Sequence, residues 1–313
     1  MRIRPATVED VPAVCAIDAA FRPDEPLDPE VERYHWAAVE PSMVTERWIL
    51  EAPDGPAGYG ILSHPAWALA QERNCIAFIG WRPRDSEQLR GLVEFVEQRA
   101  REQGGKRLSV YCREDEMAII AILIAREFKL DTLARAWELD LRRHRERLLD
   151  LTTASREAMT RQGIRLLPLG DHAAADPVRS LYEAWSDSRL DAPRSHEMTP
   201  VPFEQFLVWT RAPDQRPDRQ WLALDGDRVV GLSNLRYPPV RGNVWTNFTG
   251  TVRSHRGRGI ARAVKMETLA QAIELGVASV RTDNDERNAP MLHINEEVGY
   301  TPIPGWADYE KDL

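Results

Sequence analysis

The stretch Arg253-Ser254-His255-Arg256-Gly257-Arg258-Gly259-Ile260-Ala261 is the part of the sequence around which the rest of the chain is organised. A β-branched run at 247–252 precedes it, and a helix-compatible segment follows from about Arg258 to Leu275. The pattern predicts a strand, a glycine turn and a helix. The first turn of a helix has backbone N–H groups without intrahelical partners, and Gly257 and Gly259 would let a ligand approach them closely. The stretch therefore predicts an anion-binding loop suited to a pyrophosphate.

Two well-known phosphate-binding patterns do not fit this loop. A Walker loop requires G-x-x-x-x-G-K-[ST], which the sequence lacks. The dinucleotide-binding pattern G-x-G-x-x-G/A needs a small residue where Arg262 stands, because the helix packs closely on the strand at that point. A Rossmann domain is therefore not expected, although Asp283 lies near the position of that fold's ribose-binding acid.

Residues 256–261 fit a different pattern, [RQ]-x-x-G-x-[GA]. A second segment, from Asn288 to Tyr300, has an asparagine at its start and a Gly-aromatic pair at its end, and a helix and the predicted strand Ser279–Thr282 separate the two segments. On these two segments the chain resembles the GCN5-related N-acetyltransferase (GNAT) superfamily. The resemblance implies transfer of an acetyl group from acetyl-CoA to an amine, with acetyl-CoA as co-substrate and no metal.

The resemblance also implies which residues hold acetyl-CoA. Backbone amides near Gly257 would bind the pyrophosphate, the edge of the strand that ends at Val252 would pair with the pantetheine amides, and Asn288 would hydrogen-bond the same arm. The strand Ser279–Thr282 would diverge and leave a slot for the thioester. The implied cofactor-binding residues are Val252, Arg253, Arg256, Gly257, Arg258, Gly259, Ile260, Ala261, Asn284 and Asn288.

The candidate catalytic residues are Thr246 and Asn295. Many members of the family have a glutamate and a tyrosine at these two positions, and neither threonine nor asparagine is a strong base or acid at pH 7. Three alternatives stay open: catalysis by positioning, deprotonation through water, or an acid from the insert 186–200. The acids of that insert are Asp187, Asp191 and Glu197. The rival to an enzyme is a non-catalytic CoA-binding or regulatory module.

An internal repeat organises the chain. Residues 137–141 align with 309–313 at an offset of 172, which also places Phe128 on Tyr300. A repeat of this length predicts two copies of one domain, at 1–145 and 163–313, with a helical linker at 146–162. The turn Leu224–Asp227 joins neighbouring strands that must run antiparallel. The predicted fold class is α/β, with two tandem GNAT-like domains that are each a mixed, mostly antiparallel sheet flanked by helices.

The first copy lacks the predicted pyrophosphate loop. At the same offset, Arg256–Gly259 falls on Arg84-Asp85-Ser86-Glu87, Asn288 falls on Glu116 and Gly299 falls on Glu127. A carboxylate a few ångströms from a phosphate costs several kcal/mol at an effective dielectric constant of about 20. The first copy is therefore predicted to be a degenerate domain that does not bind CoA.

Composition limits the other possibilities. The chain has 313 residues and a net charge of −8, which fits two globular domains and argues against nucleic acid as a partner. The positive charge is mainly arginine, as in high-GC bacterial genes, and no signal peptide or membrane-spanning run is expected, so a cytoplasmic location is predicted. Three widely spaced cysteines predict buried free thiols. The expected acceptor is a small-molecule amine, and the expected assembly is a monomer or homodimer.

Overall fold

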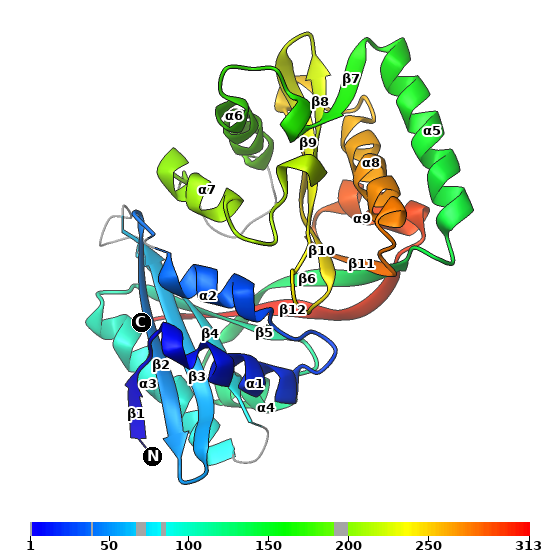
Figure 1. Ribbon diagram of the computed structural model, residues 1–313. Helices are drawn as coiled ribbons and strands as arrows, with labels where there is room; N and C mark the ends of the chain where they lie inside the picture. The colour runs from blue at the N-terminus through cyan, green and yellow to red at the C-terminus, as the bar shows by residue number, and fades with distance from the viewer. Residues whose placement is uncertain (1, 39, 67–72, 83–85, 191–199) are drawn as a thin grey trace. The chain divides into compact units, whose positions relative to one another are not determined.

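Two compact units make up the structure, a computed structural model that describes residues 2–38, 40–66, 73–82, 86–190 and 200–313 (Figure 1). The first unit comprises Met1–Ala134, Pro239–Gly242 and Pro304–Leu313. The second comprises Arg135–Pro238 and Asn243–Ile303. Both units combine helices with a mixed sheet, so the predicted α/β class is confirmed.

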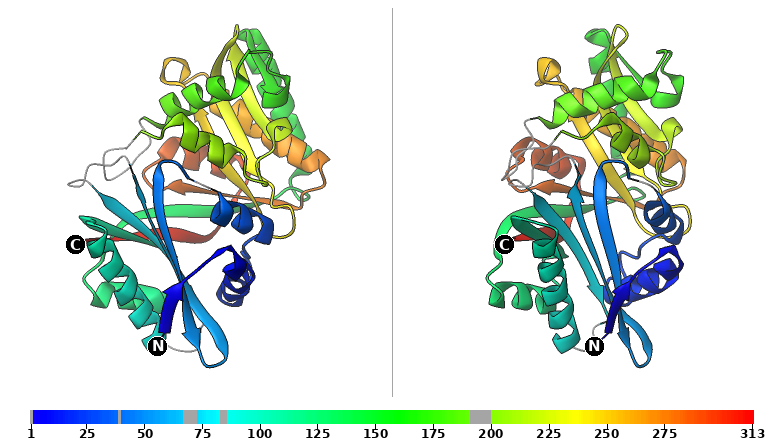
Figure 2. Two further views of the ribbon diagram at one scale, coloured as in Figure 1. Left: turned by 60° about the vertical axis from the view of Figure 1, so that its left-hand side comes forward. Right: turned by 90° about the vertical axis from the view of Figure 1, so that its left-hand side faces the viewer.

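The first unit is a sheet with helices on both faces. Its strands are β1 (Arg2–Pro5), β2 (Met43–Ala52), β3 (Gly55–Pro65), β4 (Asn74–Trp81), β5 (Arg107–Arg113) and parts of β6 (Lys129–Asp140) and β12 (Thr301–Asp312). They lie in the order β1-β2-β3-β4-β5-β12-β6, with β4 and β5 parallel. The helical elements are η1 (Val8–Asp10), α1 (Val11–Phe21), α2 (Pro29–Ala37), α3 (Ser86–Glu102) and α4 (Met117–Ala125). Figure 2 shows α1 and α2, in dark blue, on one face of this sheet and α3 and α4, in cyan and teal, on the other.

The second unit has the same layers. Its strands are the rest of β6 and β12, with β7 (Ile164–Pro168), β8 (Gln220–Asp225), β9 (Arg228–Arg236), β10 (Val244–Thr251) and β11 (Ser279–Asp285). They lie in the order β6-β11-β10-β9-β8-β7, with β10 and β11 parallel and the pairs from β7 to β10 antiparallel. The helical elements are α5 (Arg145–Arg161), η3 (Leu169–Asp171), α6 (Pro177–Arg189), α7 (Phe203–Thr210), η4 (Pro217–Arg219), η5 (Arg253–His255), α8 (Ile260–Glu274) and α9 (Ala289–Val298).

Helix α8 is mostly buried, and its exposed positions lie near its two ends. Val264 and Leu269 belong to the hydrophobic core of the second unit, and each such buried side chain contributes about 1.5–3 kcal/mol. Helix α5 packs against α8, and the Arg156 guanidinium of α5 pairs with Glu267 at 2.7 Å. Figure 1 shows α5 and α8 on one side of the sheet and α6 and α7 on the other. Most of the segment 146–162 is helical, as α5, and belongs to the second compact unit, while its assignment as a linker between the two repeats remains our proposal.

The repeat is visible in the backbone. Strand β5 and strand β11 begin and end at positions that differ by 172 residues, which is the offset found in the sequence. The left-handed residues match as well: Gly104 has φ +72° and Gly276 has φ +76°, while Glu127 has φ +69° where Gly299 has φ +102°. A left-handed glutamate costs about 1–2 kcal/mol. The first unit has therefore kept the backbone of this turn after the glycine was replaced.

Strands β6 and β12 each contribute to both units. Residues 129–134 of β6 lie in the first unit and 135–140 in the second, whereas 301–303 of β12 lie in the second and 304–312 in the first. Glu310 lies opposite Ser109 of β5, and its repeat counterpart Glu138 accepts a hydrogen bond from Arg281 of β11 at 3.0 Å. The final strand of each repeat thus completes the sheet of the other unit. The limits 1–145 and 163–313 remain our proposal for the two repeated sequences.

The three cysteines, Cys15, Cys75 and Cys112, are free and buried, as predicted. Among the described residues, no helix has the length and apolar content needed to cross a bilayer.

Three carboxylates gather in the first unit. Asp131, Asp308 and Glu310 offer oxygen atoms that all lie within 4.8 Å of one another, a spacing that could hold a cation. Burial, together with the charge of Glu310, raises the pKa of the Asp308 carboxyl to about 7. The prediction that the protein uses no metal remains a prediction.

We expect Asp308→Asn to remove a pH dependence of stability. A carboxyl whose pKa is raised in the folded state keeps its proton there to a higher pH than in the unfolded state. Its stabilising contribution to the free energy of unfolding is therefore present at low pH and is lost as pH rises from about 4 through 7. A shift of about 3 pH units corresponds to about 4 kcal/mol, so the variant should be the more stable protein at pH 8. Urea unfolding at pH 5 and pH 8, with a chelator present, measures this. Asp312→Asn, on the same strand with an 83% exposed side chain, is the control. Equal pH slopes for wild type and Asp308→Asn would contradict the assignment.

Candidate functional site

The loop before α8 exposes a helix N-terminus. Gly257 has φ +73° and Gly259 has φ +78°, a region that residues with a Cβ disfavour. Gly259 is the N-cap of α8 and has no side chain to satisfy the N–H groups of the first turn. The first turn of α8 also contains no acidic residue. The loop therefore presents free N–H donors and the positive end of the helix dipole to an anion.

A slot opens where β10 and β11 diverge. The two strands are paired in parallel at Val244 with Val280 and at Trp245 with Arg281. A bulge follows at once, since the register of β10 against β9 shifts between Thr246 and Phe248. Beyond this point β10 and β11 line a cavity of about 890 Å³ that extends to the loop before α8. The six residues from Thr246 to the end of β10 span five strand steps, which give the slot a length of about 17 Å.

Most of the predicted site residues line this cavity. They are Thr246, Arg256, Gly257, Gly259, Ile260, Ala261, Asn284 and Asn288. The cavity thus brings together β10, the glycine loop, the end of β11 and the start of α9. Thr246 and Asn288, the first and last of these residues in the sequence, are 42 positions apart.

Four predicted residues do not line the cavity. Val252 is 1% exposed and lies in the core. The backbone N–H of Arg253 donates to Asp187 at 2.7 Å, and the Arg258 guanidinium donates to Gln162 at 3.1 Å. Asn295 is fully buried behind the cavity wall, so its side chain does not reach a ligand directly. Asp187 comes from the insert named as a source of acids, while Asp191 and Glu197 lie outside the described residues.

Asn288 is available for a ligand. It is the N-cap of α9, but its side chain makes no capping hydrogen bond. The backbone carbonyl of Asn288 accepts from Met291 at 3.1 Å, so the helix begins without the help of the side chain. The side chain therefore faces a cavity instead of serving the local turn.

Asp283 and Lys265 were not among the predicted site residues. Asp283 lies on the cavity wall, two residues beyond the last residue of β11 that pairs with β10. Its side chain is exposed to the cavity, although protein surrounds the cavity. Burial raises the pKa of its carboxyl, against the opposing charges of Arg236 and Lys265. Lys265 is fully buried in α8, and burial lowers the pKa of its amine to about 7. Comparison of the two copies could have identified Lys265 as unusual, because the corresponding residue of the first copy is the apolar Val93.

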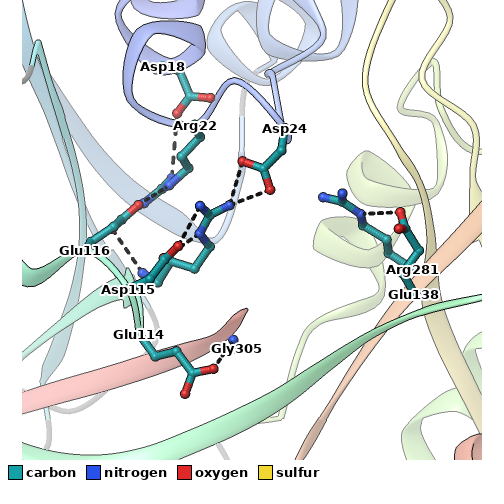
Figure 3. Close-up of polar contacts among 10 residues, drawn as sticks. Asp18, Arg22, Asp24, Glu114, Asp115, Glu116, Glu138, Arg281 and Gly305 are labelled. Atoms are coloured by element: carbon teal, nitrogen blue, oxygen red, sulfur yellow. Dashed lines mark hydrogen bonds and ion pairs between the residues drawn. The ribbon is translucent and has the colours of Figure 1, made fainter. Parts of the chain in front are cut away.

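The first unit uses the equivalent of Asn288 differently. Glu116 pairs with Arg22 at 2.5 Å and accepts a hydrogen bond from the backbone of Arg113 at 3.0 Å (Figure 3). The Arg113 guanidinium in turn pairs with Asp24 and Asp115. A network of ion pairs therefore occupies the position where the second unit presents a free amide. Arg84 and Asp85, which replace the loop arginine and glycine, lie outside the described residues.

Comparisons with known proteins agree with this geometry. Residues 178–300 match the model of the acetyltransferase (GNAT) family. Among curated proteins, none matches the sequence.

Several solved structures share the fold over 99% of this chain. A GCN5-related N-acetyltransferase from Sphaerobacter thermophilus is 18% identical, with a TM-score of 0.70 and 95% of its chain covered. A tandem GNAT protein from the clavulanic acid biosynthesis pathway is 16% identical, with a TM-score of 0.74 and 98% covered. A glucosamine N-acetyltransferase region of a fungal multi-domain β-N-acetylglucosaminidase is 14% identical, with a TM-score of 0.71 and 38% covered. These likenesses confirm the predicted tandem fold.

Proposed function

We propose that this chain transfers an acetyl group from acetyl-CoA to an amine of a small molecule, because residues 178–300 match the model of the GNAT acetyltransferase family and the cavity has a loop suited to a pyrophosphate. The observation that carries the proposal is the pair of left-handed glycines, Gly257 and Gly259, at an uncapped helix N-terminus that opens into the slot between β10 and β11.

The pyrophosphate of acetyl-CoA would bind at the loop. The N–H groups from Gly257 to Ala261 can donate to its oxygens, and the helix dipole favours the negative charge. Arg256 and Arg262 belong to the same cavity wall and add positive charge. Arg262 also pairs with Glu297 at 2.7 Å, and Arg256 donates to the backbone carbonyl of Ser188 at 3.3 Å, so a bound phosphate would share or replace these partners. We propose these two arginines as the main side-chain contacts of the phosphates, ahead of Arg253 and Arg258, because they line the cavity and the other two do not.

The pantetheine arm would extend along the slot toward Thr246. The edge of β10 beyond Trp245 is not paired with β11, so its backbone groups can bind the amides of the arm as an added strand would. Asn284 and Asn288 line the same slot and can hydrogen-bond the arm. This direction brings the thioester to the closed end, beside Thr246 and Asp283.

Asp283 is our candidate for the proton acceptor. The amine nitrogen attacks the thioester carbonyl carbon, the carbon–sulfur bond breaks, and the CoA thiolate leaves. The proton released by the nitrogen passes to the Asp283 carboxylate, the thiolate takes a proton from water, and the hydroxide formed takes up the proton held by Asp283, which restores the carboxylate. A raised pKa favours this role, because a carboxylate with a pKa closer to the working pH is a stronger base.

A non-catalytic CoA-binding module is the second candidate. The observation in its favour is that Thr246 and Asn295 offer no ionisable group, and Asn295 is fully buried. Release of CoA thiol from acetyl-CoA, measured across a panel of small primary amines, separates the two functions. We expect release that depends on the amine and saturates with it. Binding of acetyl-CoA with no amine-dependent release from any member of the panel would favour the module.

A further inference from the structure

Lys265 is fully buried within the second unit. Its Nζ donates a hydrogen bond to Oδ1 of Asn295 at 2.9 Å and lies 5.0 Å from the centre of the Tyr300 ring. Asn295 is also fully buried. An amine and an amide in such a place are stable only because they bond to each other, since an unpaired buried polar group costs several kcal/mol.

The direction of these hydrogen bonds fixes the orientation of two amides. An amine at this position acts as donor in its charged form and can donate in its neutral form, so Asn295 must turn its oxygen toward Lys265. The nitrogen of Asn295 then points the other way and donates to Oδ1 of Asn284 at 2.8 Å. With its oxygen held, Asn284 keeps its own nitrogen for other partners. Asn284 lines the cavity, so the chain of bonds leaves an N–H donor on the cavity wall.

The first copy shows that the fold does not need this polar chain. At the repeat offset of 172, Lys265 corresponds to Val93, Asn295 to Leu123 and Asn284 to Cys112. Val93, Leu123 and Cys112 are buried together in one hydrophobic cluster of the first unit. The copy without the glycine loop thus fills the same three positions with apolar side chains. The three polar residues therefore occur in the copy that has the glycine loop and the open slot.

We propose that Lys265 and Asn295 are positioning residues that hold the Asn284 amide so that its nitrogen donates to a carbonyl oxygen of the acetyl-CoA arm. The inference rests on the proposed function, because acetyl-CoA is the ligand. The arm offers amide carbonyls and the thioester carbonyl, all of which accept hydrogen bonds. Without Lys265 and Asn295, the Asn284 amide can turn over and present its oxygen, which repels a carbonyl.

The test removes the support without touching the cavity wall. Lys265→Met combined with Asn295→Leu replaces the polar pair with apolar side chains of similar size, as in the first copy. Loss of one oriented neutral hydrogen bond should raise the Kd for acetyl-CoA about tenfold by calorimetry. The same pair of substitutions made in an Asn284→Ala protein should cause no further loss of affinity for acetyl-CoA, because the amide that Lys265 and Asn295 orient is absent.

The possible outcomes are distinct. A tenfold loss both in the wild-type background and in the Asn284→Ala background would overturn the inference, because Lys265 and Asn295 would then act on binding independently of Asn284. If the double variant does not fold, Asn284→Asp still tests the donor: it offers only acceptors, and wild-type affinity for acetyl-CoA would overturn the inference. Absence of binding by the wild-type protein would instead overturn the proposed function.

Discussion

Gly259→Asp should weaken acetyl-CoA binding by about 10³-fold relative to Gly259→Asn. The two side chains have the same shape, and both aspartate and asparagine tolerate the left-handed conformation that Gly259 adopts. A Cβ at this position meets only Met159 at 4.0 Å, so neither variant should disturb the packing. The aspartate adds a negative charge a few ångströms from the pyrophosphate, which costs about 4 kcal/mol at an effective dielectric constant of 20.

Calorimetric titration of both variants with acetyl-CoA measures the effect, and thermal unfolding of each confirms that the fold is retained. Gly259→Asn should lose about tenfold in affinity, because its side chain limits the approach of the ligand to the backbone. Equal affinities for the aspartate and asparagine variants would show that the pyrophosphate does not bind at this loop.

Asp283→Asn should lower kcat by about 10²-fold, the lower end of what a positioned base contributes. The carboxylate accepts a proton only when ionised, so wild-type activity should fall as pH decreases through its pKa. Burial raises that pKa, which moves the loss of activity to a higher pH than for an ordinary aspartate. The variant should lack this acidic limb in its pH–rate profile. Its affinity for acetyl-CoA should stay within about threefold of wild type.

Asp285→Asn is the matched control for this variant. Asp285 lines the same cavity, but its carboxylate is paired with Arg287 at 2.6 Å, which lowers its pKa. A carboxylate held in this way is a poor base, so its loss should reduce kcat much less than the loss of Asp283. The assignment of Asp283 fails if Asp283→Asn keeps the wild-type kcat together with the acidic limb.

The loop and the tandem fold could be predicted because local chemistry determines them. Two glycines with positive φ at a helix N-terminus leave a pattern in the sequence, and Gly257 and Gly259 show that conformation in the structure. The repeat offset was equally informative, since it holds at both ends of β5 and β11. The resemblance also named Arg253 and Arg258, which do not line the cavity: the backbone N–H of Arg253 donates to Asp187 and the Arg258 guanidinium donates to Gln162.

The polar residues behind the cavity could not be recognised in the same way. Charged residues such as Lys265 and Glu267 would be expected on exposed parts of a helix, but in α8 both are buried. Arg156 of α5 pairs with Glu267, whereas Lys265 lies against Asn295 and the Tyr300 ring. Asp283 follows a short strand and has the sequence of a turn, while in the structure β11 continues through it to Asp285. In both cases tertiary contacts decide the environment, and no local pattern reports them.

The sequence does not predict which unit each final strand joins, and the reason is different. Because the two copies are similar, the edge of β5 and the edge of β11 offer equivalent registers to a final strand. Glu310 therefore fits opposite Ser109 just as Glu138 fits beside Arg281. The sequence is equally compatible with either partner, so only the three-dimensional structure distinguishes them.

A crystal structure of the full chain with CoA bound tests the central claim most directly. The pyrophosphate should lie on the N–H groups from Gly257 to Ala261, with the sulfur near Thr246 and Asp283. The Asn284 amide nitrogen should face a carbonyl oxygen of the arm. A pyrophosphate bound elsewhere on the second unit, or on the first unit, would contradict the account.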